Sequence, residues 1–267
     1  MVRARKRFGQ HFLHHKAILE RIADALLPPP GSLVLEVGPG QGAFTEVLLR
    51  RGVRVTAIEM DRDLVPLVRE RLPGVRVIEG DALRLDWREA AGARPGEPLL
   101  VTGNIPYNIT SPLLAKALTP PLPERIVFLV QEEVADRLAA APNSSAYGSL
   151  SVGVQAQAKV EKLFKVGAGA FHPRPKVDSA VVRITPLSPS FTPEFTRILR
   201  QLSTGLFSYR RKQLATGLRH LTGWPAGRVG EVIHQAGLDP AQRPETLAPD
   251  HFIGLLRVLI DGGWPPG

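Results

Sequence analysis

The segment 34–44, VLEVGPGQGAF, joins an apolar run to a glycine-rich turn and the start of a helical pattern. Gly38 and Gly40 would let the backbone approach a ligand closely, and the following helix would present an electropositive N-terminus. Glu59 ends the next apolar run, 21 residues after Gly38. A carboxylate there can bind the hydroxyls of a ribose. The pattern predicts a site for a cofactor that contains a nucleoside, and its alternative is a tight turn with a surface glutamate.

Two classes of enzyme share this pattern. Gly38, Gly40 and Ala43 satisfy the loose fingerprint of NAD-dependent enzymes. Glu36, however, lies inside the apolar run, where a methyltransferase uses an acidic residue to anchor the amino-acid end of S-adenosylmethionine. Asp81, in the segment GDAL, ends a third apolar run. It could accept a hydrogen bond from the cofactor's adenine amine, although such a segment is also a common turn. Both carboxylates favour S-adenosylmethionine.

Residues 104–107, Asn-Ile-Pro-Tyr, directly follow a fourth apolar run. They resemble the Asn–(Leu, Ile or Pro)–Pro–(Tyr or Phe) motif of methyltransferases that modify exocyclic amino nitrogens of bases. The Asn104 side-chain oxygen and the Ile105 carbonyl can each accept a hydrogen from an adenine amine, which directs the nitrogen lone pair at the methyl donor. Pro106 fixes φ, and Tyr107 offers a face on which an extruded base can stack. The alternative is a loop with a buried tyrosine.

This chemistry requires neither a general base nor a metal ion. The methyl donor carries a sulfonium and the proton leaves after attack, so catalysis depends on positioning and hydrogen bonding. The seven histidines lack metal-ligand spacing and the chain has no cysteine. We therefore predict no metal site, and the lack of cysteine fits a cytoplasmic protein.

The elements that would position these residues alternate between strands and helices. Strands are predicted at 32–38, 53–59, 75–81, 98–104 and 124–130, and helices at 16–27, 43–51 and 64–72. The strands are nearly continuous apolar runs, which is typical of parallel strands buried on both faces. The order predicts an α/β fold with a Rossmann-like parallel sheet and helices on both faces.

The pattern changes in the second half of the chain. Two further strands at 159–166 and 179–185 would extend the sheet in an antiparallel sense, and a linker rich in Pro and Ser follows at about 186. Beyond it all periodic segments are helical, at 194–203, 206–221, 226–236 and 249–261. We predict a catalytic domain over 1–187 and a small all-helical domain over 188–267.

Composition narrows the possible partners. The formal net charge of +9 indicates a polyanionic partner such as nucleic acid, although many basic proteins bind none. No apolar run reaches the roughly 18 residues of a membrane span. The basic N-terminus lacks the apolar stretch of a secretory signal. We expect a cytoplasmic protein that does not act at a membrane.

Over its whole length the chain resembles the KsgA/RsmA type of ribosomal RNA adenine dimethyltransferase. The resemblance is carried by the ordered segments RFGQHFL, VLEVGPGQG, AIEMD, EGDAL, GNIPYNITSP, FLVQEEVADRL, FHPRPKVDSAVV and FSYRRKQL. It implies a class I methyltransferase domain followed by a helical domain that binds RNA or the ribosome. It also implies S-adenosylmethionine as the cofactor.

The resemblance also assigns site residues, with residues 10–13 wrapping over the cofactor. Cofactor contacts are expected from Gln10, His11, Leu13, Glu36, Gly38, Gly40, Glu59, Met60, Asp81, Ala82 and Asn104. Most members carry Asn where this chain has His11. The catalytic set comprises Asn104, Ile105, Pro106, Tyr107 and Phe171. Phe171 would be a second aromatic residue near the target base, unless it simply packs in the core.

The implied substrate is a pair of adjacent adenosines in a hairpin near the 3′ end of 16S rRNA, within a small-subunit assembly intermediate, dimethylated by a monomeric enzyme. RNA contacts are expected from Arg5, Lys6, Arg7, Arg210, Arg211 and Lys212. The alternative for these residues is a solvated helix face. Two other functions stay open: the related large-subunit methyltransferases of macrolide resistance, and a non-catalytic RNA-binding relative. An NAD dehydrogenase is less compatible, because no catalytic Tyr-Lys, His or Cys set accompanies the glycines.

Overall fold

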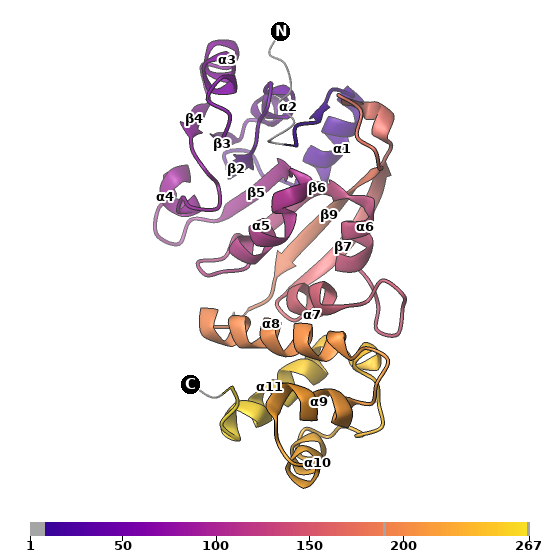
Figure 1. Cartoon of the computed structure of the whole chain (residues 1–267). Coiled ribbons are helices and arrows are strands. Elements are labelled where there is room, and N and C mark those ends of the chain that lie inside the picture. The colour runs from indigo at the N-terminus through magenta and orange to yellow at the C-terminus, as the bar shows by residue number, and fades with distance from the viewer. Residues whose placement is uncertain (1–8, 189–190, 266–267) are drawn as a thin grey trace. The chain divides into compact units, whose positions relative to one another are not determined.

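The computed structural model describes residues 9–188 and 191–265, which form two compact units (Figure 1). The sheet unit contains the described residues up to Ala135 together with Lys159–Pro186, and the helical unit contains Asp136–Ala158 and the described residues from Leu187 onward. The sheet unit ends at Pro186, one residue before the predicted end of the catalytic domain at 187. The segment Asp136–Ala158 differs from the prediction, because it belongs to the helical unit and not to the unit that holds the sheet.

A mixed sheet of seven strands organises the described part of the sheet unit. Its strands, in spatial order, are β4 (Arg76–Glu79), β3 (Arg54–Glu59), β2 (Leu33–Val37), β5 (Leu99–Asn104), β6 (Arg125–Gln131), β9 (Ser179–Pro186) and β7 (Ala158–Val166). The pairs from β4 to β6 are parallel, and β9 pairs with β6 in the antiparallel sense. All seven strands were predicted, each within two residues at either end. The chain reverses its direction of travel across the sheet between β2 and β5, which is where such folds bind ligands.

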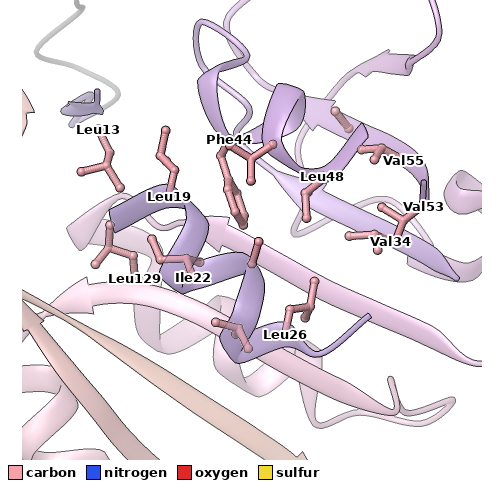
Figure 2. Close-up of a cluster of buried hydrophobic side chains, with 14 of the residues drawn as sticks. Leu13, Leu19, Ile22, Leu26, Val34, Phe44, Leu48, Val53, Val55 and Leu129 are labelled. Carbon is pink, nitrogen blue, oxygen red and sulfur yellow. The ribbon is translucent and has the colours of Figure 1, made fainter. Parts of the chain in front are cut away.

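Both faces of the central strands are buried. Val34, Val55 and Leu129 join one cluster with Leu19 and Phe44 from the overlying helices (Figure 2). The neighbouring strand residues, such as Leu35, Val101 and Phe128, point to the other face and are equally buried. Because successive strand residues face opposite sides, burial of both sets explains the unbroken apolar runs in the sequence.

Helices and short 3-10 turns connect these strands. They are α1 (Lys16–Leu26), α2 (Ala43–Arg50), α3 (Leu64–Arg71), α4 (Trp87–Ala91), η2 (Tyr107–Ile109), α5 (Thr110–Ala117), α6 (Glu132–Leu138) and η3 (Ala168–Ala170). Helix α1 ends where Leu27 adopts a left-handed conformation, directly before three prolines that cannot continue the helix. A separate two-stranded ladder joins β1 (Phe12–Leu13) to β8 (Phe171–His172) in the antiparallel sense.

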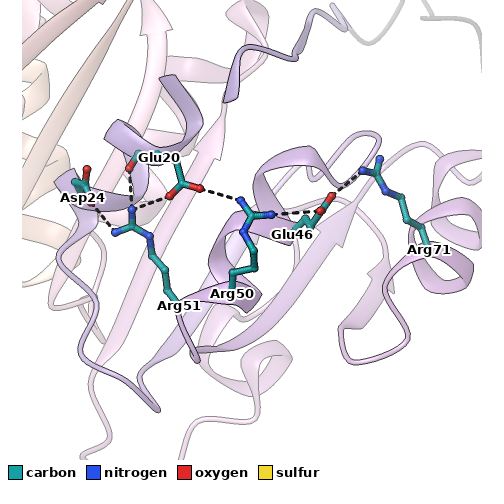
Figure 3. A network of polar contacts seen from close by, with 6 residues as sticks. All are labelled: Glu20, Asp24, Glu46, Arg50, Arg51 and Arg71. Carbon is teal, nitrogen blue, oxygen red and sulfur yellow. Dashed lines mark hydrogen bonds and ion pairs between the residues drawn. The ribbon is translucent and has the colours of Figure 1, made fainter. Parts of the chain in front are cut away.

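A chain of ion pairs links the surfaces of α1, α2 and α3 (Figure 3). Glu20 accepts from Arg50 at 2.8 Å and from Arg51 at 2.9 Å. Glu46 continues the chain to Arg71 at 2.7 Å. These side chains are 27–53% exposed, so each pair contributes at most about 1 kcal/mol.

The helical unit has a core of its own. Its elements are α7 (Ser149–Gln155), α8 (Pro193–Ser208), α9 (Leu214–Thr222), α10 (Ala226–Gln235), η4 (Pro244–Thr246) and α11 (Pro249–Asp261). Tyr147 is fully buried among Leu202, Phe252 and other apolar side chains, and its hydroxyl donates to the Leu247 carbonyl at 2.8 Å. These contacts explain why Asp136–Ala158 belongs to this unit: its partners come from distant parts of the sequence.

One predicted helix boundary is wrong. The sequence predicted a break between helices at 194–203 and 206–221, whereas α8 runs without interruption to Ser208 and the chain turns at 209–213. Gly205 lies at the predicted break. A Cβ at this position would lie 2.6 Å from Leu221, so the glycine permits close packing of α8 on the end of α9 and does not end the helix.

Candidate active site

The turn between β2 and α2 provides open space at the carboxyl edge of the sheet. Gly38 and Gly40 have φ values of +70° and +58°, in the left-handed region that favours glycine. A Cβ at Gly38 would meet no atom within 4 Å, whereas one at Gly40 would lie 2.9 Å from the Phe12 ring. Gly38 therefore leaves room for a ligand, and Gly40 lets the segment around Phe12 close over the turn.

Two neighbouring cavities of the sheet unit open at this turn. The first, which we call the Glu59 cavity, has a volume of about 230 Å³ and is lined by Glu59, Met60, Asp81, Ala82 and the segments 9–12 and 104–109, among others. The second, the Glu36 cavity, has a volume of about 300 Å³ and is lined by Glu36, Leu13, Phe44 and others. Phe12, Gly38, Gly40 and Asn104 line both. The predicted cofactor residues are therefore brought together around one continuous site.

Glu59 is held in a fixed orientation. It is 5% exposed, and its two carboxylate oxygens accept the backbone N–H groups of Gly40 at 3.1 Å and Asp61 at 2.9 Å. Burial raises the pKa of the Glu59 carboxyl above its ordinary value, and these N–H groups offset part of the rise. A carboxylate fixed in this way keeps further lone pairs for a diol in the cavity.

Glu36 is a buried carboxyl in this site, and one of its two oxygens lacks a hydrogen-bond partner among the described residues. It is 2% exposed, and its Oε2 has no hydrogen-bond partner among the described residues. Burial raises the pKa of the Glu36 carboxyl to about 7, the nearby Thr45 hydroxyl lowers it in part, and Glu59 raises it further. An unpaired buried carboxylate is unfavourable. A cationic group such as the ammonium of an amino acid would fit beside it.

Asp81 is a second carboxylate that lines the Glu59 cavity. Its Oδ1 accepts the N–H of Leu83 at 2.9 Å, and its Oδ2 lies 3.5 Å from Nε of Arg84. Met60, 54% exposed, forms an apolar part of the lining nearby. A carboxylate next to apolar side chains suits an adenine, which presents an amine edge and two apolar faces.

The N-terminal segment closes over the site and contacts the catalytic loop. Gln10 donates to Asp61 at 3.0 Å, and Leu13 is buried where β1 pairs with β8. Asn104 donates its Nδ2 hydrogen to the backbone carbonyl of His11 at 2.7 Å. The Asn104 amide is therefore oriented, because its nitrogen is engaged and its Oδ1 is the atom left to accept.

The rest of the Asn-Ile-Pro-Tyr loop is fixed by buried contacts. Ile105 is 1% exposed, and its N–H donates to the Leu129 carbonyl of β6 at 3.0 Å. The Pro106 carbonyl accepts the N–H of Ile109 at 3.1 Å. The Tyr107 ring stacks on His11 with centroids 5.8 Å apart, and a hydrogen bond of 3.2 Å joins its hydroxyl to Ser179. Tyr107 thus lines the cavity and is not the wholly buried tyrosine of the alternative interpretation.

Other predicted site residues lie elsewhere. Phe171 is 4% exposed, belongs to the core of the sheet unit, and lines neither cavity. This position favours the packing alternative. Arg210 is engaged within the helical unit, where it pairs with Glu245 at 2.5 Å and donates to the carbonyls of Ser144 and Ser145. Arg210 is a structural residue of that unit and does not present a free cation.

The remaining RNA-binding candidates divide into two groups. Arg211 and Lys212 are exposed, in the turn between α8 and α9. Arg5, Lys6 and Arg7 lie outside the described residues.

Among the described residues there is no cluster of three or more side chains that could hold a metal ion, and no helix is long and apolar enough to cross a membrane.

Sequence reasoning missed two residues that shape the site. Phe12 lines both cavities, and Ser179 holds the Tyr107 hydroxyl. Both belong to segments that carried the family resemblance, RFGQHFL and FHPRPKVDSAVV. Neither residue type suggests binding or catalysis by itself, so only their positions in space reveal the roles.

The sheet order, the glycine turn and the acidic residues at the ends of successive strands define a class I S-adenosylmethionine-dependent methyltransferase. The chain belongs to the ribosomal RNA adenine dimethylase family, whose model matches residues 1–259. It is accordingly an enzyme, an rRNA adenine dimethyltransferase that uses S-adenosylmethionine. Membership in this family rules out the NAD dehydrogenase interpretation.

The relatives agree with this assignment. Ribosomal RNA small subunit methyltransferase A of Nitrosococcus oceani is 44% identical over 263 residues, with 97% of each chain covered. The protein of that name from Pseudomonas aeruginosa is 42% identical over 264 residues, covering 97% of this chain and 96% of that protein. Among solved structures, a dimethyladenosine transferase from Plasmodium falciparum is 27% identical with a TM-score of 0.78, covering 95% of this chain and 98% of that one. The 23S rRNA methyltransferase ErmE is 27% identical with a TM-score of 0.70, covering 93% and 99%.

Proposed function

We propose that this enzyme dimethylates N6 of two adjacent adenosines in a hairpin near the 3′ end of 16S rRNA. The observation that carries the proposal is the position of Asn104, which lines both cavities and has its amide oriented by the His11 carbonyl. A cofactor whose two ends occupy the two cavities would have its sulfonium centre between them, beside the Asn104 Oδ1.

The residues of the two cavities suit the two ends of S-adenosylmethionine. Glu59 would bind the ribose hydroxyls, with Asp81, Met60 and Ala82 around the adenine. In the other cavity, Glu36 would face the ammonium group, near Gly38 and Leu13. When bound, the cofactor supplies an electrophilic methyl group on a sulfonium.

The protein's part in the transfer is to hold the target amine. Asn104 Oδ1 and the Ile105 carbonyl accept its two hydrogens, and Tyr107 stacks against the base. The nitrogen then forms a bond to the methyl carbon as the bond from carbon to sulfur breaks, and the amine loses one proton to solvent. Pro106 keeps this loop rigid, so that little reorganisation accompanies the reaction.

Binding of RNA would extend beyond the target base. Arg211 and Lys212 are proposed to bind phosphates from the helical unit, together with Arg5, Lys6 and Arg7. Neutralising Arg211 and Lys212 should flatten the dependence of RNA affinity on salt. Arg210→Gln should instead lower the stability of the helical unit, because it removes the partner of Glu245 and two backbone contacts. An unchanged salt slope in the Arg211 and Lys212 variant would exclude this turn from the RNA interface.

The small-subunit assignment rests on relatives that are 41–44% identical over nearly the whole chain and carry that name. Among the solved structures, the large-subunit enzyme ErmE and the dimethyladenosine transferase from Plasmodium falciparum are both 27% identical, and the TM-score of ErmE is lower, 0.70 against 0.78. We propose that the protein acts as a monomer in the cytoplasm, on an assembly intermediate of the small subunit.

The test is methylation of unmethylated small and large ribosomal subunits with a labelled cofactor, followed by mapping of the label. Dimethylation of two adjacent adenosines in 16S rRNA is the expected result. Label confined to 23S rRNA would favour the macrolide-resistance type of activity. No incorporation into either RNA by the folded, cofactor-binding protein would favour a non-catalytic RNA-binding role.

A further inference from the structure

The segment from the last residue of β8 to the start of β9, which we call the basic loop (residues 172–178, HPRPKVD), carries two cations. Arg174 and Lys176 are exposed, whereas Pro175 between them is buried. Neither cation forms a hydrogen bond or an ion pair with another residue in the described part of the chain. They contrast with Lys165, which pairs with Glu132 and Asp178 at 2.8 Å each.

The start of the basic loop is attached to the segment that closes over the cofactor site. His172 pairs with Phe12 in the short β1–β8 ladder. The His11 Nδ1 lies 2.7 Å from the backbone carbonyl oxygen of Pro173. A carbonyl oxygen can only accept, so Nδ1 carries the hydrogen and donates it. The same imidazole stacks on Tyr107. His11 therefore connects the start of the loop to the Tyr107 ring, on which the target base is proposed to stack.

The end of the loop returns to the same tyrosine. Ser179, the first residue of β9, is hydrogen-bonded to the Tyr107 hydroxyl at 3.2 Å. Asp178 accepts the N–H of Ala168 at 2.9 Å and pairs with Lys165. Both ends of the loop are thus fastened to residues around the proposed base site.

This arrangement suits a polyanion that passes the active site. A loop with fixed ends and a buried central proline has few conformations to lose on binding. Within the described residues its two cations form no hydrogen bond or ion pair that a phosphate would have to displace, although the pKa of Asp178 in the same loop is lowered by Lys165 and, to a smaller extent, by the charge of Arg174. A base extruded against Tyr107 brings its own backbone phosphates to the edge of the site. The exposed Arg174 and Lys176 belong to a loop whose two ends contact His11 and Tyr107 at that site.

We infer that Arg174 and Lys176 bind the RNA phosphates that flank the adenosine held at Asn104 and Tyr107. This inference rests on the proposed function, since it takes RNA as the substrate. It assigns the basic loop to substrate positioning, apart from the cofactor site and from the cations of the helical unit.

The experiment compares the double variant R174Q/K176Q with a matched control, R76Q/R94Q. Arg76 and Arg94 are also exposed, and they lie near the amino ends of β4 and β5, at the opposite edge of the sheet. Both double variants remove two positive charges. Affinity for unmethylated small ribosomal subunits is measured by filter binding from 50 to 200 mM KCl at constant magnesium.

Loss of two contacts to single-stranded phosphates should reduce the slope of log affinity against log salt by about 1.4, which corresponds to about 25-fold weaker binding at 0.1 M salt. The control should bind like the wild type. The conservative variant R174K/K176R should retain most of the affinity, and calorimetry should show unchanged affinity of R174Q/K176Q for S-adenosylmethionine. The single variants R174Q and K176Q should each show about half the loss of slope.

An R174Q/K176Q slope equal to that of the control would overturn the inference, while wild-type methylation of 16S rRNA would leave the proposed function intact. Equal losses in both double variants would also overturn it, because they would indicate a general effect of net charge. Failure of the wild type to bind or methylate the subunits would instead refute the proposed function.

Discussion

Replacing Glu36 by glutamine is expected to stabilise the cofactor-free protein, by an amount that depends on pH. Glu36 is 2% exposed, and its Oε2 has no hydrogen-bond partner among the described residues. Burial raises the pKa of its carboxyl from 4.5 to about 7. The folded protein therefore favours the neutral carboxyl more strongly than the unfolded chain does, and ionisation of Glu36 destabilises the fold.

The size of this effect follows from the two pKa values. The interval from 4.5 to about 7 corresponds to about 3 kcal/mol, an order-of-magnitude figure. The penalty is absent below the unfolded pKa, grows as the pH rises between the two values, and is constant above the folded pKa. An amide cannot ionise. The difference in free energy of unfolding between Glu36→Gln and the wild type should therefore increase by about 3 kcal/mol between pH 4.5 and 8.

Urea unfolding followed by circular dichroism over this pH range measures the difference. Glu70→Gln on α3 is the control, because Glu70 is exposed and its replacement should produce no such increase. Saturating S-adenosylmethionine at high pH should stabilise the wild type more than Glu36→Gln. The analogue 5′-methylthioadenosine, which lacks the amino-acid end, should stabilise both equally. Stability curves for wild type and Glu36→Gln that run parallel at all pH values would refute the reasoning about the buried carboxyl.

Three further predictions concern the cofactor and the target base. Glu59→Ala should weaken S-adenosylmethionine binding by about tenfold or more while the fold is retained, because a carboxylate fixed by two N–H groups is lost; unchanged affinity by calorimetry would contradict the ribose assignment. Tyr107→Ala should slow methylation far more than it weakens cofactor binding, whereas Tyr107→Phe should be mild because it loses only the contact with Ser179; equal loss in single-turnover assays would argue against stacking. Asn104→Ala should shift the ratio of monomethyl to dimethyl adenosine. In the first step the amine donates one hydrogen to Asn104 Oδ1 and one to the Ile105 carbonyl, but in the second step it has a single hydrogen to donate, so the two steps depend unequally on Asn104. Mass spectrometry of digested RNA at saturating cofactor measures this ratio, and equal slowing of both steps would exclude the hydrogen-bond account.

Much of the sheet unit could be predicted from the sequence. A strand buried on both faces needs a continuous apolar run, and a glycine with positive φ is required where the backbone turns closely around a ligand. These local requirements identified β2, β3 and β5 and the carboxylates at their ends. The Asn-Ile-Pro-Tyr segment was equally informative, because the chemistry proposed for it depends on four consecutive residues.

Charge and aromatic character were poorer guides, since their meaning depends on partners that are distant in sequence. Arg210 was predicted to contact RNA, yet Glu245 and two carbonyls more than 60 residues away engage it. Phe171 was predicted near the base, yet its pairing with Leu13 across the β1–β8 ladder buries it in the core. Neither contact can be predicted from a pattern of neighbouring residues along the chain.

The sequence by itself therefore determined the class of fold and the cofactor, and it predicted the loop that we propose to be catalytic, because each depends on short-range geometry that a few neighbouring residues impose. Only the tertiary structure decided which side chains surround them. It assigned residues 136–158 to the helical unit and brought the His11 carbonyl to the Asn104 amide. It also separated Arg210, which is engaged by Glu245, from Arg174 and Lys176 of the basic loop, which form no hydrogen bond or ion pair within the described residues. Burial and partner choice arise when segments far apart in the chain pack together, and no local propensity encodes them.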